Sequence, residues 1–361
     1  MNKRITLADI AAEAGVHKTT VSMALRNHPN LPRHTIERIQ QIAERMGYRP
    51  DPALSALNAY RHDTRTASSG GTLAYLTNWN SRFGWKEHSA HHLFFEGATQ
   101  AAYRLGYSMD HFWIGDPELT QTRLNHILQS RGIRGLLLAS WLPQHDLELE
   151  LEWDHFTGIK IDYFPSAVSL HSVTNDQLTL MQLAFQSLLD RGYQRIGLVM
   201  PDLWDSYVKN AWSIGCLAAQ QTVAPETRVP MLRYGASTVY GVADTNIRVS
   251  ADMLREWMAA NRPDVILSYE PYVREAFAEL GLIPGQNLSY ADLFVERGNV
   301  SVAGVVNRCE DVGRTAVELL VGQIQRNAMG RVEYENRILV QGYWVDGPSL
   351  VAAPEVRAGS A

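Results

Sequence analysis

Short apolar segments alternate with amphipathic ones along most of the chain, and this alternation constrains the fold more than any other feature. The apolar segments predict strands at 73–77, 107–114, 135–139, 158–163, 195–200, 231–234, 265–268 and 288–291. The amphipathic segments predict helices at about 93–105, 119–129, 177–190, 207–220, 249–260 and 272–280. Because strands that alternate with helices form parallel sheets, we expect an α/β core with helices on both faces. A polar break at about 164–176 indicates two consecutive doubly wound halves.

The first fifty residues follow a different pattern, which predicts three short helices. Thr6 and Asp9 have the spacing of a capping box, and Gly15 follows the first helix, where a positive φ is needed. Ala11 and Val21 are expected to be buried where the first two helices cross. Ala11, Gly15 and Val21 at this spacing are typical of a helix-turn-helix, whose second helix enters the DNA major groove. The same residue types also occur in ordinary helical hairpins.

The distribution of charge agrees with a DNA-binding head. Residues 1–65 carry ten Lys or Arg and six Asp or Glu, a net charge of +4, whereas the whole chain carries −5. A basic region on an acidic protein favours contact with a polyanion. Solvated surface charge of either sign is common, so this feature supports the head only together with the helix pattern.

The composition argues against several other classes of protein. The chain has no run of 18 apolar residues, as a transmembrane helix would need. No apolar segment follows Lys3 and Arg4, so we expect no secretory signal and a cytoplasmic location. Its two cysteines, Cys216 and Cys309, can build neither a disulfide framework nor a four-thiolate zinc site.

Sequence motifs for catalysis and metal binding are also absent. The chain has no Walker loop, nucleophile elbow or dinucleotide fingerprint. His88, His91, His92 and Glu96 match neither the His-Glu-x-x-His spacing nor a zinc finger, and we interpret them as polar surface groups. We therefore expect no enzyme, no cofactor and no metal.

A linker separates the head from the core. The sequence RPDP at 49–52 predicts a stiff, extended exit, because proline biases the residue before it away from helix. A short helical segment follows at 53–60, and the small, polar residues 64–71 are typical of a linker. We therefore place the head at 1–50, a hinge helix and linker at 51–71, the core at 72–350, and a frayed tail at 351–361.

Several segments resemble the LacI/GalR family of transcription regulators. They are TLADIA at 6–11, GV at 15–16, TVS at 20–22, MGYRP at 46–50, VAGV at 302–305, GRTAV at 313–317 and GYWVDG at 342–347. The resemblance implies an all-α helix-turn-helix head joined by a hinge helix to a core of two doubly wound parallel-sheet lobes, like type I periplasmic binding proteins. It also implies a first lobe at about 72–165 plus 303–328 and a second at about 172–298 plus 332–350.

The resemblance assigns the reading of DNA to the second helix. Lys18 can donate to guanine or to phosphate, and Thr19 can contact a thymine methyl. Met23 stands where the family commonly has Arg, and a thioether makes no bidentate contact with guanine, so we expect a different base pair there. Thr20, Ser22 and Arg26 are better placed for phosphates, although Thr20 could instead be a packing residue. The expected DNA-binding residues are Thr6, Lys18, Thr19, Thr20, Ser22, Met23, Arg26, Tyr48, Ala53, Ala56 and Leu57.

Residues 53–60 resemble the family's hinge helix. Ala53 and Ala56 are small enough for the backbone to approach the minor groove, where Leu57 would insert between bases and bend the duplex. A helix this short is marginal in water, so we expect it to order only on operator DNA. The alternative is a plain linker helix whose leucines pack on the core.

In the family, an effector binds between the lobes, at the carboxyl ends of the strands. The expected effector-binding residues are Asn78, Trp79, Phe83, Trp141, Asp176, Trp212, Glu270, Asp292 and Asn307. Trp212 stands where relatives that bind sugars or nucleobases usually carry Arg. Its lack of a guanidinium disfavours an anionic ligand and favours stacking on a neutral one, such as a sugar.

The resemblance therefore implies a homodimeric, sequence-specific transcriptional regulator, most often a repressor of carbohydrate-related genes in this family. Its expected partners are a pseudo-palindromic operator, a small neutral effector and a second copy of the chain, with no membrane. The alternative is an α/β enzyme or a solute-binding module that carries a helix-turn-helix. The sequence leaves open which molecule is the effector and whether it releases the protein from DNA or recruits it.

Overall fold

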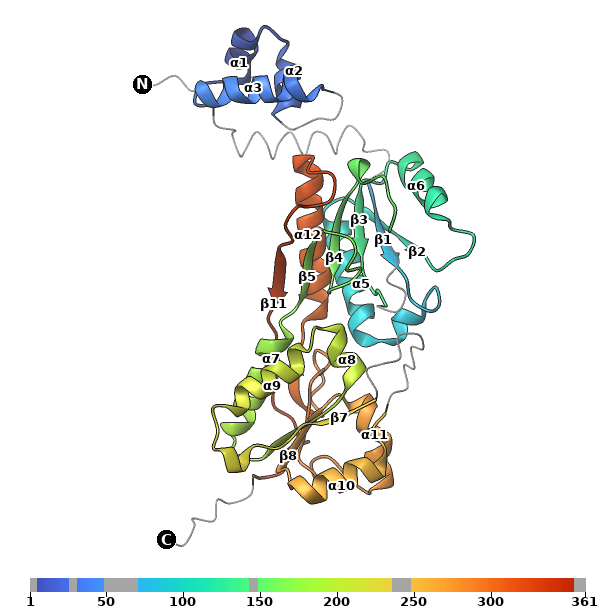
Figure 1. Ribbon diagram of the computed structural model, residues 1–361, viewed down its shortest axis with the longest axis vertical. Helices are drawn as coiled ribbons and strands as arrows, with labels where there is room; N and C mark the ends of the chain where they lie inside the picture. Colours follow the sequence, from blue (N-terminus) through green and yellow to red (C-terminus); the bar gives the residue numbers. More distant parts are fainter. Residues whose placement is uncertain (1–4, 26–30, 49–70, 143–148, 236–247, 354–361) are drawn as a thin grey trace.

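Three helices form the N-terminal head: α1 (Leu7–Ala14), α2 (Lys18–Ala24) and α3 (Arg33–Arg45) (Figure 1). The structure is a computed structural model, and it describes residues 5–25, 31–48, 71–142, 149–235 and 248–353. The capping box is confirmed, because Thr6 Oγ1 accepts from the Asp9 amide and the Asp9 carboxylate accepts from the Thr6 amide. Gly15 ends α1 with a φ of 65°, as the sequence predicts.

The centre of the head is a small apolar core. Ile10 of α1, Val21 of α2 and Ile39 of α3 are fully buried against one another. Ala11 is also buried, so Ala11 and Val21 lie on the packed faces, as their spacing predicts. Lys18 and Thr19, in the first turn of α2, are exposed to solvent.

Two six-stranded sheets form the rest of the chain. The first has the order β11-β5-β4-β3-β1-β2 and is parallel throughout. Its strands are β1 (Thr72–Thr77), β2 (Ser108–Trp113), β3 (Gly135–Leu138), β4 (Thr157–Ile161), β5 (His171–Asn175) and β11 (Arg337–Val340). The second has the order β12-β10-β9-β8-β6-β7, in which only β12 is antiparallel to its neighbour. Its strands are β6 (Ile196–Pro201), β7 (Leu232–Tyr234), β8 (Val265–Ser268), β9 (Tyr290–Asp292), β10 (Ala303–Val306) and β12 (Tyr343–Val345).

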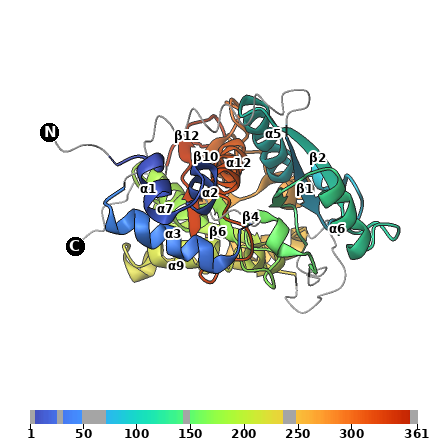
Figure 2. The same ribbon diagram turned by 90° about the horizontal axis from the view of Figure 1, so that it is seen from above.

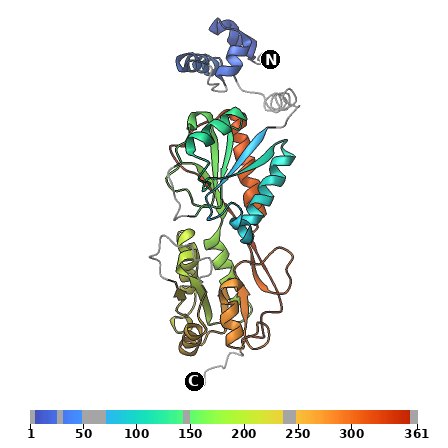
Figure 3. The ribbon, with the colours of Figure 1, turned by 90° about the vertical axis from the view of Figure 1, so that its right-hand side faces the viewer.

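Helices cover both faces of each sheet, which gives two lobes one above the other (Figure 3). The first sheet packs against α5 (Ser89–Arg104) and α12 (Cys309–Arg326) on one face and α6 (Gln121–Ser130) on the other. The second packs against α7 (Gln177–Leu189) and α9 (Ala211–Gln220) on one face and α10 (Ala251–Asn261) and α11 (Glu270–Glu279) on the other. No helix in the described parts of the chain combines the length and the apolarity that a membrane span requires. The predicted fold class, a helix-turn-helix head with two parallel-sheet α/β lobes, is confirmed.

The lobe boundaries differ from those expected, because the chain passes between the described lobes three times. Strand 303–306 belongs to the second sheet, where it pairs with β9 and β12, and not to the first lobe. Residues 337–340 belong to the first sheet rather than to the second lobe, because the chain returns there after α12 and pairs with β5. Residues 172–175 also lie in the first sheet. The remaining domain boundaries stay predictions.

Strand β5 lies within the segment that the sequence pattern marks as a polar break. Four of its five residues are polar, three of these (Ser172, Thr174 and Asn175) are buried, and side-chain hydrogen bonds compensate for their burial. Thr174 donates to Asp162 over 2.6 Å, and Ser172 accepts from Arg337 over 3.1 Å. A hydrophobicity pattern cannot detect such a strand.

The helix expected at 207–220 is interrupted. The structure has a short helix α8 (Asp202–Tyr207) and then α9, and the turn between them has positive φ values at Lys209 (58°) and Asn210 (59°). This break places the side chains of α8 at the mouth of the space between the lobes.

Candidate functional site

The second helix of the head exposes the residues expected to read DNA. Lys18 and Thr19 are exposed, whereas Thr20, Ser22 and Met23 are half-buried. Val21, between them in sequence, is fully buried and holds α2 in the head. The resulting surface suits a groove-reading helix, and the individual DNA contacts stay predictions.

Local hydrogen bonds constrain two of the expected DNA-binding residues. His17 caps α2: its Nδ1 accepts from the Thr19 amide at 3.4 Å and lies 2.9 Å from the Thr19 hydroxyl. The Thr6 hydroxyl donates to the Asp9 carboxylate over 2.6 Å. Sequence reasoning missed His17, although its position just before the helix could have indicated a cap.

Of the remaining residues expected to bind DNA, the structure describes only Tyr48. Tyr48 is half-buried and packs on the core of the head. Arg26, Ala53, Ala56 and Leu57 lie outside the described residues.

A cavity of about 1060 Å³, its open mouth included, lies between the two lobes. Twenty residues line it: Trp79, His88, Ala90, His91, Phe94, Trp141, Leu142, Asp162, Phe164, Asn175, Gln177, Pro201, Leu203, Trp204, Tyr207, Val208, Trp212, Tyr272, Phe294 and Asn307. Nine of the twenty are Trp, Tyr or Phe, which makes the wall suited to stacking against a ring.

Four of the residues predicted to bind the effector line this cavity: Trp79, Trp141, Trp212 and Asn307. Three of these have a buried polar atom without a hydrogen-bond partner in the structure, namely Trp141 Nε1, Trp212 Nε1 and Asn307 Oδ1. The side chains that carry them are 6%, 2% and 2% exposed. Because buried polar groups are normally paired, two donors and one acceptor at one cavity indicate a site for a ligand or ordered water.

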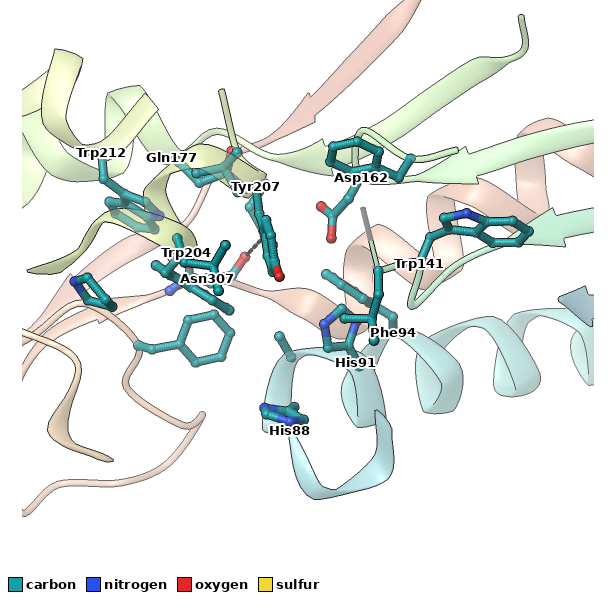
Figure 4. Close-up of a pocket in the computed structure, with 18 of the residues that line it drawn as sticks. His88, His91, Phe94, Trp141, Asp162, Gln177, Trp204, Tyr207, Trp212 and Asn307 are labelled. Atoms are coloured by element: carbon teal, nitrogen blue, oxygen red, sulfur yellow. Dashed lines mark hydrogen bonds between the residues drawn. The ribbon is translucent and has the colours of Figure 1, made fainter. Parts of the chain in front are cut away.

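Asp162 lies at the carboxyl end of β4 and contributes the only carboxylate among the described residues that line the cavity. Figure 4 shows the carboxylate pointing into the cavity, between Tyr207 and Trp141 in this view. One of its oxygens, Oδ1, accepts from the Thr174 hydroxyl at 2.6 Å. Burial raises the pKa of Asp162 to about 6, an effect that Thr174 and the nearby Arg337 charge partly offset. Its φ of 68° is uncommon outside glycine, and such backbone strain is concentrated at functional sites.

The comparisons with known proteins agree with this architecture. Residues 6–51 match the family described as "Bacterial regulatory proteins, lacI family". The chain is 26% identical over 199 residues to the HTH-type transcriptional regulator reg1 of Streptomyces lividans, a match that spans 54% of this chain and 53% of reg1. It is 23% identical over 346 residues to the HTH-type transcriptional regulator PtxS of Pseudomonas putida, covering 94% of this chain and 96% of PtxS.

Solved structures extend the likeness to the whole fold. A lac repressor dimer bound to operator and the anti-inducer ONPF has a TM-score of 0.56 at 18% identity, covering 97% of this chain and all of that one. A complex of the regulator CelR with cellobiose has a TM-score of 0.55 at 18% identity, covering 96% of this chain and all of that one. The head therefore matches the lacI family of bacterial regulatory proteins, and the chain as a whole has the fold of these solved structures.

Five of the residues expected to bind the effector do not line the cavity, and three of them are held by backbone groups. Asn78 donates to the Leu142 carbonyl and accepts from the Leu142 amide. Asp176 caps α7 by accepting from the Thr179 amide. Asp292 accepts from the amides of Glu270 and Phe294 and from the Tyr290 hydroxyl. These side chains shape the cleft through the backbone they hold, and Phe294 reaches the cavity next to Asp292.

The other two point elsewhere. Phe83 is 51% exposed, with the Lys86 ammonium 4.9 Å from its ring centre. Glu270 forms an ion pair with Arg274, one turn later on α11. Both follow strand ends in the sequence, and proximity to a strand end was the reason for expecting them here.

Two histidines, interpreted from the sequence as surface groups, line the cavity. The ring centres of His88 and His91 lie 5.0 Å and 4.8 Å from that of Trp79. Desolvation lowers the pKa of His91 to about 3 and also lowers that of His88, so both are neutral at pH 7. The surface interpretation is wrong for these two, because the first turn of α5 packs against the strand end that carries Trp79. The described residues contain no cluster of His, Cys, Asp and Glu that could hold a metal ion.

Among the other lining residues that sequence reasoning missed, Asp162, Trp204 and Tyr207 had a detectable signal. Asp162 directly follows a buried strand, but the expected strand at 158–163 placed it inside the strand. Trp204 and Tyr207 lie on α8, of which the expected helix at 207–220 included only Tyr207. A search for polar residues immediately after each strand would have identified Asp162, and a search for aromatic residues in the segment after β6 would have identified Trp204 and Tyr207.

Proposed function

We propose that this chain is a homodimeric repressor that binds a pseudo-palindromic operator and responds to a small, hydroxylated, sugar-like effector in the cleft between its lobes. The observation that carries the proposal is the pairing of a family-matched helix-turn-helix with an aromatic cleft in one chain. A ligand that binds one arrangement of the lobes better than another shifts the population of that arrangement. Effector binding would thereby change operator affinity.

Support for operator binding comes from α2. Its packed face is buried in the head, and its other face presents Lys18 and Thr19 to solvent. Two such heads related by a two-fold axis would contact two half-sites one helical turn apart or a multiple of it. The solved lac repressor that shares this fold is described as a dimer bound to operator.

Support for a sugar-like effector comes from the cavity wall. Aromatic faces stack on the apolar face of a sugar ring, and unpaired indole N–H groups and an amide oxygen can bind hydroxyl groups. Lys and Arg are absent from the described lining residues, which disfavours phosphorylated or acidic sugars.

The test is selection of binding sites from a random duplex library, followed by titration at two salt concentrations. We expect two-fold symmetric sites, and an affinity that falls by about 10³ or more between 50 and 200 mM salt if six or more phosphates are contacted. Lys18→Ala should weaken binding to the selected site. Lys86→Ala removes the same charge from the first lobe, outside the head, and should have little effect on DNA binding. Monomeric binding without sequence preference would contradict the proposal.

A further inference from the structure

The charge of the cleft comes from one side chain, because Asp162 is the only ionised group among the described lining residues at pH 7. The two lining histidines are neutral there, since desolvation lowers their pKa values. The Lys209 ammonium lies over the Phe164 ring, 5.4 Å from its centre, and is not a lining residue. The wall therefore presents one negative charge and no positive charge to a ligand.

The Asp162 carboxylate is also without an ionic partner. It belongs to no ion pair between described residues, and Thr174 supplies its one side-chain hydrogen bond. The guanidinium of Arg337 affects it from a distance, lying 4.3 Å from the centre of the Tyr163 ring, with Nε donating to Ser172. Asp162 is half-buried, and a partly desolvated carboxylate without a counter-ion is costly, so a cation placed next to it would offset part of that cost.

The surrounding wall suits a cation as well. Trp204, Tyr207 and Trp212 line the same cavity as Asp162, and Figure 4 shows Tyr207 beside its carboxylate in that view. The faces of aromatic rings attract an ammonium group, most strongly when it is desolvated. A carboxylate surrounded by aromatic rings binds a protonated amine more tightly than it binds a hydroxyl group.

We propose that the effector is an amino sugar, or a hydroxylated amine of similar size, whose ammonium group binds the Asp162 carboxylate. This inference rests on the proposed function, which puts the effector in the cleft. The hydroxyl groups would accept from Trp141 Nε1 and Trp212 Nε1 and donate to Asn307 Oδ1, which are three of the four unpaired side-chain atoms among the described lining residues, the fourth being His91 Nδ1. The amine replaces the neutral ligand expected from Trp212 alone, because that expectation did not include Asp162.

The experiment is calorimetric titration of the full chain at pH 7 with three sets of sugars. The sets are glucosamine, galactosamine and mannosamine, their parent hexoses, and their N-acetyl derivatives, with glucuronate as the anionic probe. We expect at least one hexosamine to bind about 10- to 100-fold more tightly than both its parent hexose and its N-acetyl form, the gain of a charged hydrogen bond over a neutral one. Glucuronate should bind most weakly. Equal affinities, tighter binding of a neutral sugar, or no binding of any hexosamine would overturn the inference.

Variants test the assignment to Asp162. Asp162→Asn keeps the shape and the bond from Thr174, and Asn also tolerates a positive φ. It should lower the affinity for the hexosamine to about that for its parent hexose and so remove the preference for the amine. Asp252→Asn, on an exposed face of α10, should keep the preference. If Asp162→Asn fails to fold, the comparison of sugars on the unmodified chain still decides.

Operator binding in the presence of each sugar separates this inference from the proposed function. A hexosamine that binds tightly without changing operator affinity would contradict the proposed regulation and leave the inference standing. A neutral hexose that changes operator affinity, when hexosamines do not, would overturn the inference and leave the proposed regulation standing.

Discussion

Some buried polar side chains of this chain hold the backbone, whereas others that line the cleft remain unpaired. The Asn78 amide exchanges both of its hydrogen bonds with Leu142, and Asp292 accepts from three donors. By contrast, Trp141 and Trp212 have unpaired N–H groups. Only the second kind has hydrogen-bonding capacity left for a ligand. Residue type and position after a strand do not distinguish the two kinds.

The buried His91 should make the stability of the protein depend on pH. Its pKa is about 3 in the folded chain and about 6.5 when unfolded, so the unfolded state binds more protons between these values. The free energy of unfolding therefore loses up to about 2 kcal/mol from this residue as the pH falls from 7 to 5. His91→Gln should reduce that loss in urea unfolding measured at both pH values.

Two carboxylates act with the opposite sign. The pKa values of Asp162 and Asp292 are raised to about 6, so their contribution favours the folded state as the pH falls below 6. Comparing each variant with the parent chain cancels this common contribution. His126→Gln, at an exposed position of α6, serves as the control. A parent and a His91→Gln variant with the same pH dependence would refute the assignment.

At the scale of elements, the contact between α5 and α12 depends on two glycines. The two helices lie side by side against one face of the first sheet (Figure 2). A Cβ atom at Gly97 would overlap the carbonyl oxygen of Glu310, and one at Gly313 would overlap that of Phe94. The helix backbones therefore meet directly, and this contact fixes the first turn of α5, which carries His91 to the cleft.

Replacing either glycine should separate the helices. Gly97→Ala and Gly313→Ala should each lower the free energy of unfolding by about 1–3 kcal/mol or more, because backbone atoms cannot move aside as a side chain can. Gly322→Ala on α12 is the matched control. Its Cβ would lie 3.3 Å from the end of the flexible Arg326 side chain, so it should be neutral or stabilising by up to about 1 kcal/mol. Urea unfolding measures all three, and equal effects would contradict this account.

At the scale of the whole molecule, the chain crosses between the lobes three times: after β5, after β10 and after β11. Hydrogen bonds join these three crossing segments. The Asn175 side chain donates to the Asn307 carbonyl and accepts from the Cys309 thiol, which joins the first crossing to the second. The Asp176 amide donates to the Val340 carbonyl at 3.0 Å and so joins the first crossing to the third. The three crossing segments between the lobes thus form one hydrogen-bonded unit. This unit borders the cavity, because Asn175 and Asn307 also line the cavity.

Asn175→Ala should weaken the coupling between the lobes. The variant leaves a buried carbonyl and a thiol without their partner, which costs about 1–3 kcal/mol of stability. We also expect unfolding to become less cooperative, so that fluorescence and circular dichroism transitions no longer coincide. Asn261→Ala, which removes a side-chain bond to the Trp257 carbonyl at the end of α10, is the control. Coincident transitions in the Asn175 variant would show that the lobes couple by other contacts.

The sequence by itself determined the local elements and the class of fold. The capping box at Thr6, the turn at Gly15 and the alternation of strands and helices all act between near neighbours, so pattern and propensity suffice. The tertiary structure decided which lobe each crossing strand joins, that polar β5 is a buried strand, and which side chains face the cleft. Those outcomes depend on hydrogen bonds and packing between residues far apart in the chain, such as Asn175 with Asn307. The same long-range packing brings Asp162, unnoticed in the sequence, into the cavity wall.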